Sequence, residues 1–127
     1  MKSLQQEQGQ QLVEFALTLL IVLTILMFAV DFGRAVYGYS VISQAAQEAA
    51  RFGIVRPYDE AGIVQTARQW AIALDPALIG VSVSWPDAAT VEVQVTYQFY
   101  PVVPLVNQFL DGQPFLLLSN TARMSLN

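Results

Sequence analysis

The sequence contains neither cysteine nor histidine. The absence of cysteine excludes disulfides and thiolate nucleophiles, and the two absences together remove the usual zinc ligands and imidazole acid–base chemistry. Without histidine, the serines and threonines cannot form a standard catalytic triad. The fold must therefore be held by packing alone.

Charge is scarce as well. Charged residues make up 13% of the 127 residues, against about 25% in an average soluble domain. The six basic residues form no cluster, which argues against a nucleic-acid partner because neutralising phosphates requires clustered Lys or Arg. The acidic pair Asp59 and Glu60 is interpreted as a helix start, and Asp87 and Asp111 as turn residues. No nucleophile elbow, phosphate-binding loop or metal-ligand cluster occurs, so we expect no enzyme activity, no catalytic residue, no cofactor and no metal.

Apolar residues, by contrast, make up 54% of the chain, and many of them lie in one block near the N-terminus. The stretch from Phe15 to Val30 carries no charge and is bounded by Glu14 and Asp31. The apolar character extends over 12–32, which as a helix is about 30 Å long and matches the hydrocarbon core of a bilayer. We therefore predict a transmembrane helix over 12–32.

Two other interpretations of this block are weaker. A buried core helix is disfavoured because the block is apolar on every side and the rest of the chain is too small to enclose it. A secretory signal peptide normally has about 7–15 apolar residues followed by a cleavage site. Cleavage near Gly33-Arg34-Ala35 would release a soluble domain that starts near Val36. A retained signal-anchor is preferred because the block is long and the helical pattern continues through that point.

The orientation of the span is weakly encoded, because Lys2 precedes it and Arg34 follows it. The short leader and the larger folded part after the span place the N-terminus in the cytoplasm. The expected organisation is a leader or cytoplasmic segment over 1–9, a long helix over 10–53, and an extracytoplasmic α+β domain over 54–127, with the chain single-pass in the cytoplasmic (inner) membrane.

The long helix is predicted to run from near Gln10 to near Phe52, because no proline occurs before Pro57. Gly53 and Arg56-Pro57 are expected to end it. Its outer half shows apolar residues at three- and four-residue steps. This packing stripe comprises Ala35, Tyr39, Ile42, Ala46, Ala49 and Phe52. The stripe would pack against the chain's own domain and, as a further hypothesis, against neighbouring copies.

The remainder predicts an α+β domain. Asp59 would cap a second helix, whose apolar face would be formed by Ile63, Val64, Ala67, Trp70, Ala71 and Leu74. Alternation over 81–85 and 90–99 predicts an antiparallel hairpin with a turn over 86–89, and 115–126 predicts a third strand. The connection over 100–114 is rich in apolar residues and is expected to form a packed or amphipathic segment. The second helix and the outer half of the first would cover the three-stranded antiparallel sheet.

Four segments in this order resemble the TadE-like proteins of tight-adherence pilus systems, within the wider type IV pilin-like group. They are Gly9 with Glu14-Phe15; Asp31-Phe32-Gly33-Arg34-Ala35; Ala45-Ala46-Gln47-Glu48-Ala49-Ala50-Arg51; and the pattern from Val93-Gln94-Val95-Thr96-Tyr97 through Pro101 and Pro104 to Thr121-Ala122-Arg123-Met124.

The resemblance implies a pseudopilin made with a short leader. A membrane-embedded prepilin peptidase would cut after Gly9, leaving Gln10 as the new N-terminus. Glu14, the assembly carboxylate, would meet the N-terminal amine of a neighbouring subunit. The leader departs from the family pattern, because Lys2 is its only basic side chain and it also carries Glu7. The alternative for Glu14 is a carboxylate at the membrane edge, near the helix N-terminus, that reaches toward water.

The resemblance thus predicts a non-enzymatic subunit that takes part in assembling a tight-adherence type pilus or a related secretion apparatus. Its partners would be membrane lipid, the prepilin peptidase, the assembly machinery and other pilin-like subunits. The subunit would form a self- or hetero-oligomer and become part of a cell-surface filament. The alternative is a permanently anchored extracytoplasmic binding module that is neither processed nor assembled.

Overall fold

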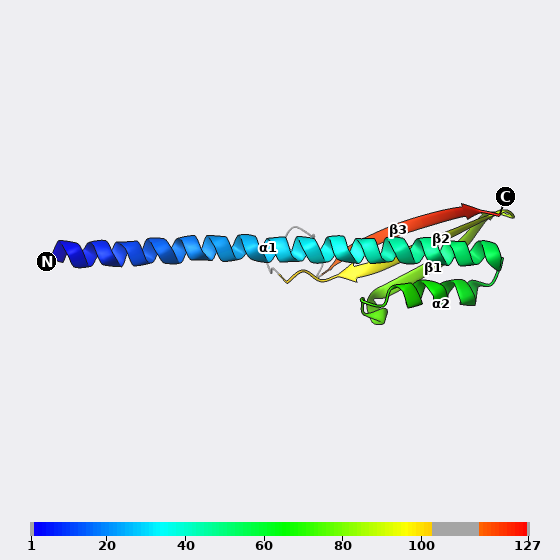
Figure 1. Cartoon of the computed structure of the whole chain (residues 1–127), viewed down its shortest axis with the longest axis horizontal. Helices are drawn as coiled ribbons and strands as arrows, with labels where there is room; N and C mark the ends of the chain where they lie inside the picture. Colours follow the sequence, from blue (N-terminus) through cyan, green and yellow to red (C-terminus); the bar gives the residue numbers. More distant parts are fainter. Residues whose placement is uncertain (1, 103–114, 127) are drawn as a thin grey trace.

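The computed structural model describes residues 2–102 and 115–126 of the chain. A single long helix, α1, runs from Lys2 to Val55, which corresponds to about 80 Å at 1.5 Å per residue. Its N-terminal half extends alone, and its C-terminal half carries a small α+β domain (Figure 1). The predicted α+β architecture is confirmed.

Both ends of α1 lie beyond the predicted bounds. The helix includes residues 3–9, where straight-chain side chains with a low helical cost predominate and no stop signal occurs. It continues past Gly53 to Val55 and ends before Arg56, whose helical conformation is disfavoured by the following Pro57. The prediction that Gly53 ends the helix is therefore wrong.

Gly53 instead allows a close contact between elements. A Cβ atom at this position would lie 3.1 Å from the side chain of Val91 and 3.2 Å from that of Ile63. Both of these side chains are fully buried, so neither has free space into which it could move. Gly53 therefore serves the packing of α1 against β2 and α2, and it lies inside the helix.

The second helix, α2, spans Glu60–Trp70 and lies beside α1 (Figure 1). Asp59 is its N-cap, because its Oδ1 accepts a hydrogen bond from the N–H of Gly62 at 3.1 Å. The buried face continues from Ile63 and Ala67 to Ala71 and Leu74 in the following turn. Trp70, which was expected on this face, is 46% exposed, because the four-residue step from Ala67 places Ala71 in the buried position.

A short 3-10 helix, η1 (Pro76–Leu78), leads into a sheet of three strands: β1 (Ile79–Asp87), β2 (Thr90–Phe99) and β3 (Leu116–Ser125). The order is β1-β2-β3, and both neighbouring pairs are antiparallel. The β1–β2 turn is tightened by Asp87, whose carboxylate accepts from the N–H of Ala89 at 2.8 Å. The strand β1 exceeds the predicted 81–85 by two residues at each end.

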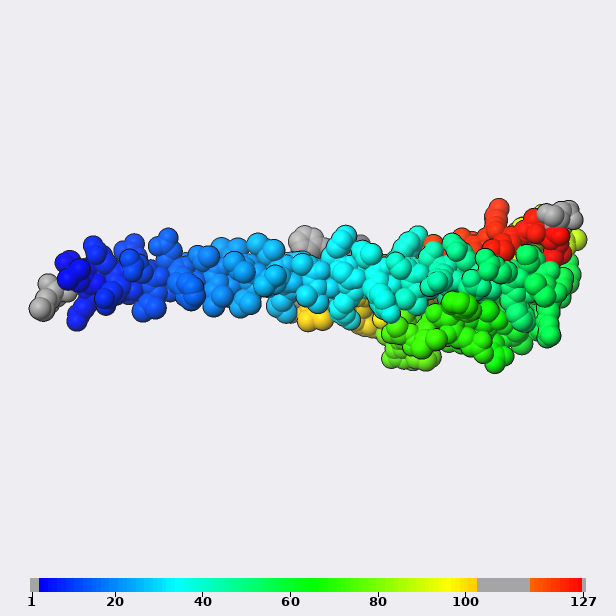
Figure 2. Space-filling view, viewed as in Figure 1, coloured from blue at the N-terminus to red at the C-terminus, as the bar shows by residue number. Residues whose placement is uncertain are grey.

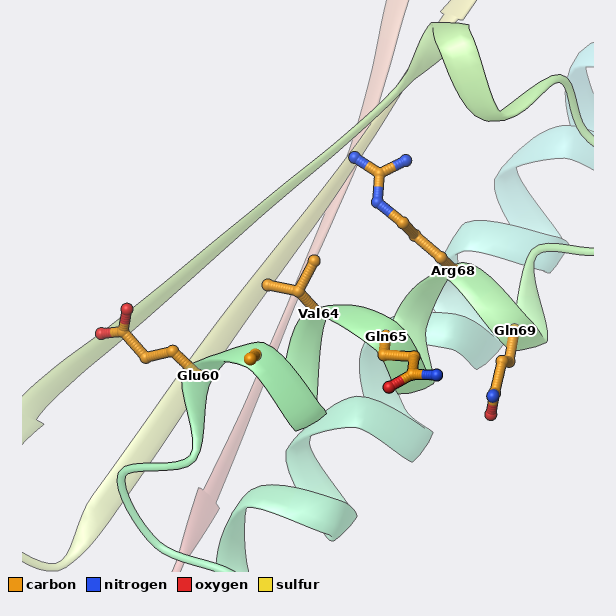
Figure 3. Close-up of a pocket in the computed structure, with 6 residues that line it drawn as sticks. Glu60, Val64, Gln65, Arg68 and Gln69 are labelled. Atoms are coloured by element: carbon orange, nitrogen blue, oxygen red, sulfur yellow. The ribbon is translucent and has the colours of Figure 1, made fainter.

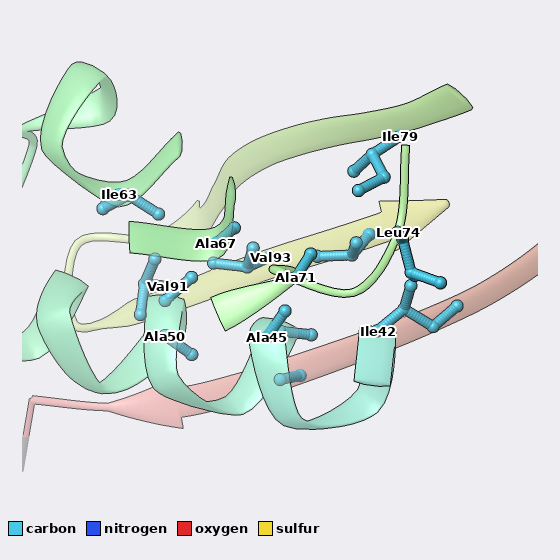
Figure 4. Packing of buried hydrophobic residues seen from close by; sticks show 14 residues of the cluster. Ile42, Ala45, Ala50, Ile63, Ala67, Ala71, Leu74, Ile79, Val91 and Val93 are labelled. Atoms are coloured by element: carbon cyan, nitrogen blue, oxygen red, sulfur yellow. The ribbon is translucent and has the colours of Figure 1, made fainter. Parts of the chain in front are cut away.

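The core lies between the sheet and the two helices (Figure 4). The central strand contributes Val91, Val93 and Val95, which are fully buried. Small side chains on α1 allow the helix to approach the sheet closely. The buried residues of α1 are Gly38, Ile42, Ala45, Ala46, Ala49, Ala50 and Gly53, together with Asp31 near the middle of the helix. The expected packed segment over 100–114 falls mostly outside the described residues.

Candidate functional site

The N-terminal half of α1 is the most unusual surface of the molecule. Every residue from Ser3 to Val30 is exposed, and Figure 2 shows the N-terminal part of this stretch projecting away from the domain. Its most apolar 18-residue window has a mean hydropathy of 2.6, and none of that window is buried within the structure. Such a surface is unstable in water, so the helix fits a single-pass membrane anchor.

Glu14 lies in this exposed apolar surface, between Val13 and Phe15. In the described part of the chain, the ion pairs are Asp31–Arg34, Glu48–Arg51 and Glu92–Arg123. None of them includes Glu14. Its backbone carbonyl accepts from the hydroxyl of Thr18 at 2.9 Å, but its carboxylate has no charged partner within residues 2–102 and 115–126. A carboxylate in such surroundings is expensive unless it is paired from outside the chain or reaches water.

Gly9 and Gln10 lie in unbroken helix, with no boundary between the expected leader and the rest of α1. A Cβ atom added to Gly9 would meet no atom within 4 Å, so the described chain does not itself require glycine there. The first turn carries no acidic residue that would favour the helix dipole. The bond between Gly9 and Gln10 lies about two turns from the start of the helix.

The predicted packing stripe divides into three levels of exposure. Ile42, Ala46 and Ala49 are fully buried against the sheet and α2, and Ala35 and Phe52 are half-buried. Tyr39 is 46% exposed, and its hydroxyl accepts a hydrogen bond from the side-chain amide of Asn120 at 3.1 Å. The buried members are covered by this chain's own domain. Ala45 and Ala50, small residues beside the stripe that the sequence marks for close approach of another surface, are also fully buried. Sequence reasoning missed the buried Gly38.

A polar junction joins the exposed half of α1 to the domain. Asp31 is only 5% exposed. Its Oδ1 accepts from the backbone N–H of Val102 at 2.9 Å and from Arg34 Nη1 at 3.3 Å. The same Arg34 nitrogen donates to the carbonyl of Tyr100 at 3.5 Å, and the guanidinium carbon lies 5.1 Å from the centre of the Phe99 ring. The sequence alone could not reveal these contacts, because Asp31 and Val102 are 71 positions apart.

The described part of the domain has an open hollow on its surface. This hollow lies on α2 and is lined by Glu60, Ala61, Val64, Gln65, Arg68 and Gln69 (Figure 3). The cation of this hollow is already engaged, because Arg68 donates to the carbonyls of Pro76 at 3.2 Å and Ile79 at 3.5 Å. Among the described residues, no group of three or more acidic side chains gathers as a metal site would require.

A comparison with protein families bears on the long helix. The family model described as TadE-like protein matches residues 9–51, from the glycine before the span to the end of the alanine-rich stretch. No curated protein and no solved structure matches the chain. The resemblance inferred from the sequence is confirmed over this segment, whereas its C-terminal part lies beyond the match. Residues 9–51 are therefore similar to the TadE-like family, and this match supports a TadE-like protein.

Proposed function

We propose that the chain is a non-enzymatic, pilin-like subunit of a tight-adherence type pilus or a related secretion apparatus. The observation that supports this most is the exposed half of α1, in which Glu14 has no charged partner within the described chain. The helix first needs lipid to cover it. When the subunit leaves the membrane, only other apolar helices can replace that lipid, so the surface that anchors the subunit is also its assembly surface.

In this proposal a prepilin peptidase cuts after Gly9 and creates an ammonium group on Gln10. Glu14 lies four residues later, on the same face of the helix. The ammonium of one subunit would pair with Glu14 of its neighbour, because each charge lowers the cost of keeping the other out of water. Gly9 supports this role, since an added Cβ there would meet nothing within 4 Å and no packing within the described chain calls for glycine.

The same proposal fixes the topology. The N-terminus is cytoplasmic, 12–32 crosses the cytoplasmic membrane once, and the domain over 54–127 is extracytoplasmic until the subunit joins a surface filament. The partners are therefore lipid, the peptidase, the assembly machinery and other pilin-like subunits.

The first measurement to make is the identity of the N-terminal residue of the mature protein. The protein would be purified from membranes of its native host and analysed by intact mass and terminal peptide mapping. A chain that starts at Gln10 is expected, and a Gly9→Leu variant should keep its leader. A native chain that starts at Met1 or Lys2 would contradict processing.

The role of Glu14 is tested by Glu14→Ala, with Glu7→Ala as a matched control in the leader. Removing one member of a poorly solvated ion pair costs about 3 kcal/mol or more, so Glu14→Ala should lower the amount of subunit in sheared surface filaments by about a hundredfold or more. Glu7→Ala should leave that amount unchanged. Quantitative immunoblots of the surface and membrane fractions measure the ratio, and equal incorporation of Glu14→Ala and wild type would refute the assigned role.

Two observations favour the alternative of a permanently anchored binding module. The helix runs without a break through the proposed cleavage point, and Lys2 is the leader's only basic side chain. In that case the intact leader stays on the mature protein, and both variants, Glu14→Ala and Glu7→Ala, behave like the wild type.

A further inference from the structure

The chain that follows β2 runs back along α1 toward the exposed half of the helix. We call Tyr100, Pro101 and Val102 the strap. Figure 1 shows the chain leaving the end of β2 in this direction, and Figure 2 shows this yellow-orange segment lying against α1 beyond the edge of the domain. Val102 lines an apolar groove together with residues of α1. The α1 residues of the groove are Leu23, Leu26, Met27 and Val30.

The position of this groove along α1 matters because it lies within 12–32. Val102 is therefore beside turns of α1 that the anchor hypothesis places in the bilayer, on the membrane side of Asp31. Its side chain remains 56% exposed. Exposure of this apolar side chain next to an apolar helix is unfavourable in water but favourable in lipid.

Backbone groups at this depth need partners, because lipid tails offer no hydrogen bonds. The N–H of Val102 is satisfied by the carboxylate of Asp31 at 2.9 Å. The carbonyl of Tyr100 accepts from Arg34 at 3.5 Å, and Pro101 has no N–H to satisfy. The Asp31–Arg34 pair thus provides polar partners to the strap where water becomes scarce.

Tyr100 fits the same environment. Its side chain is 41% exposed, and its hydroxyl donates to Gln98 Oε1 at 3.3 Å, on the side of the domain. Tyrosine has an apolar ring and a polar end, and it is enriched, like tryptophan, at the boundary between headgroups and acyl chains.

We propose that the strap is a second membrane contact, in which Pro101 and Val102 enter the lipid bilayer beside α1 and Asp31 and Arg34 hold them at that depth. The domain then rests directly on the bilayer surface. This inference depends on the membrane-anchor part of the proposed function and is independent of leader removal and filament assembly. Lipid is the occupant because the groove is continuous with the lipid-facing surface of the span.

The absence of cysteine makes the test direct. Spin labels would be attached to three single-cysteine variants of the full chain: Val102→Cys in the strap, Ile21→Cys in the middle of the span, and Ser84→Cys on the exposed face of β1. Each would be reconstituted in phosphatidylcholine–phosphatidylglycerol vesicles, and its collision rates with oxygen, which concentrates in lipid, and with a water-soluble nickel chelate would be compared. The oxygen-to-nickel ratio at Val102→Cys should be several-fold above that at Ser84→Cys and approach that at Ile21→Cys.

The controls separate the possible failures. A lipid-like ratio at Ile21→Cys with a water-like ratio at Val102→Cys overturns the second contact and leaves the anchor intact. A water-like ratio at Ile21→Cys overturns the anchor and everything that rests on it. Protection at Val102→Cys that disappears when protein is diluted in excess lipid shows that a second copy covers the strap, which also overturns the inference.

The positioning role of Asp31 is tested in the Val102→Cys background. Asp31→Asn keeps an oxygen that can accept the N–H of Val102, so the label should retain most of its lipid-like ratio. Asp31→Leu removes the acceptor, so the ratio should fall toward that of Ser84→Cys. An unchanged ratio in Asp31→Leu, with the domain shown by circular dichroism to be folded, would show that Asp31 does not hold the strap.

Discussion

The two halves of α1 share one backbone but use their side chains in opposite ways. From Leu12 to Val30 large apolar residues are exposed on all sides, whereas from Gly38 to Gly53 the buried face is built mainly from alanine and glycine. The first half is suited to fluid lipid, which adapts to any apolar shape. The second half is suited to a fixed sheet, which requires a matching surface. One continuous helix is therefore suited to two environments, lipid along its first half and the chain's own sheet along its second half. The change from large to small side chains marks the boundary between them.

The glycines of α1 illustrate the same difference. A Cβ atom at Gly9 or Gly33 would meet nothing within 4 Å, whereas at Gly38 it would lie 3.4 Å from the ring of Tyr97 and at Gly53 3.1 Å from Val91. Packing within the described chain explains Gly53, whereas a Cβ atom at Gly38 would make only ordinary van der Waals contact. Packing gives no reason for Gly9 or Gly33. The unexplained pair lies in or next to the half that is proposed to meet other molecules.

The largest expected effect comes from truncating the packed half. Ile42→Ala removes a fully buried side chain and should lower the free energy of unfolding of the domain by about 3 kcal/mol. The matched change Ile25→Ala in the exposed half should leave it within about 0.5 kcal/mol of wild type. Urea unfolding of the full chain in detergent, followed by tryptophan fluorescence, measures both. Equal losses in the two variants would show that the halves are not independent.

The converse experiment disturbs the exposed half. Leu20→Arg places a charge near the centre of the span and should make membrane insertion less favourable by about 3 kcal/mol. Gln69→Arg adds the same charge to the exposed surface of α2 and should not affect insertion. Glycosylation mapping in microsomes reports the inserted fraction. If Leu20→Arg lowered the melting temperature of the domain without changing insertion, the N-terminal half of α1 would be part of the core. The assignment of that half as a membrane anchor would then be wrong.

The smallest effect distinguishes the glycines. Gly53→Ala should destabilise the domain by about 1 kcal/mol, because the steric conflict with buried Val91 and Ile63 outweighs the gain in helix propensity. Gly33→Ala meets no such conflict and should be neutral or stabilising by a few tenths of a kcal/mol. Thermal unfolding of both variants measures the difference, and stabilisation by Gly53→Ala would show that the contact between α1 and β2 is looser than the structure indicates.

Local patterns were sufficient to predict most of the fold. Period-two alternation placed β2 at Thr90–Phe99, and a capping aspartate placed the start of α2 after Asp59. These signals lie within a few residues of the structure that they specify. The long apolar helix was predictable for the same reason, since its apolar residues form one contiguous block.

The errors have a common physical cause, which is that contacts between distant segments decide them. Gly53 was expected to end α1, but it is needed where Val91 and Ile63 approach. Trp70 was expected on the buried face of α2, but Ala71 takes the buried position there and Trp70 is exposed. Asp31 does bound the apolar block, and only its bond to Val102 was not predicted, because that bond depends on the path of the chain after β2. The proposed roles of Gly9 and Glu14 stay predictions, because they concern other molecules.

The unbroken course of α1 has a mechanical consequence. The helix contains no proline between Lys2 and Val55, so a pull on its N-terminal half is transmitted along one hydrogen-bonded rod to the turns that contact β2 and β3. These turns follow one another along the axis, from Gly38 to Gly53. A force along the axis therefore loads them together in shear, whereas a sideways force would peel them apart one turn at a time. The contact between α1 and the sheet is therefore expected to resist a pull along the helix axis better than a sideways pull.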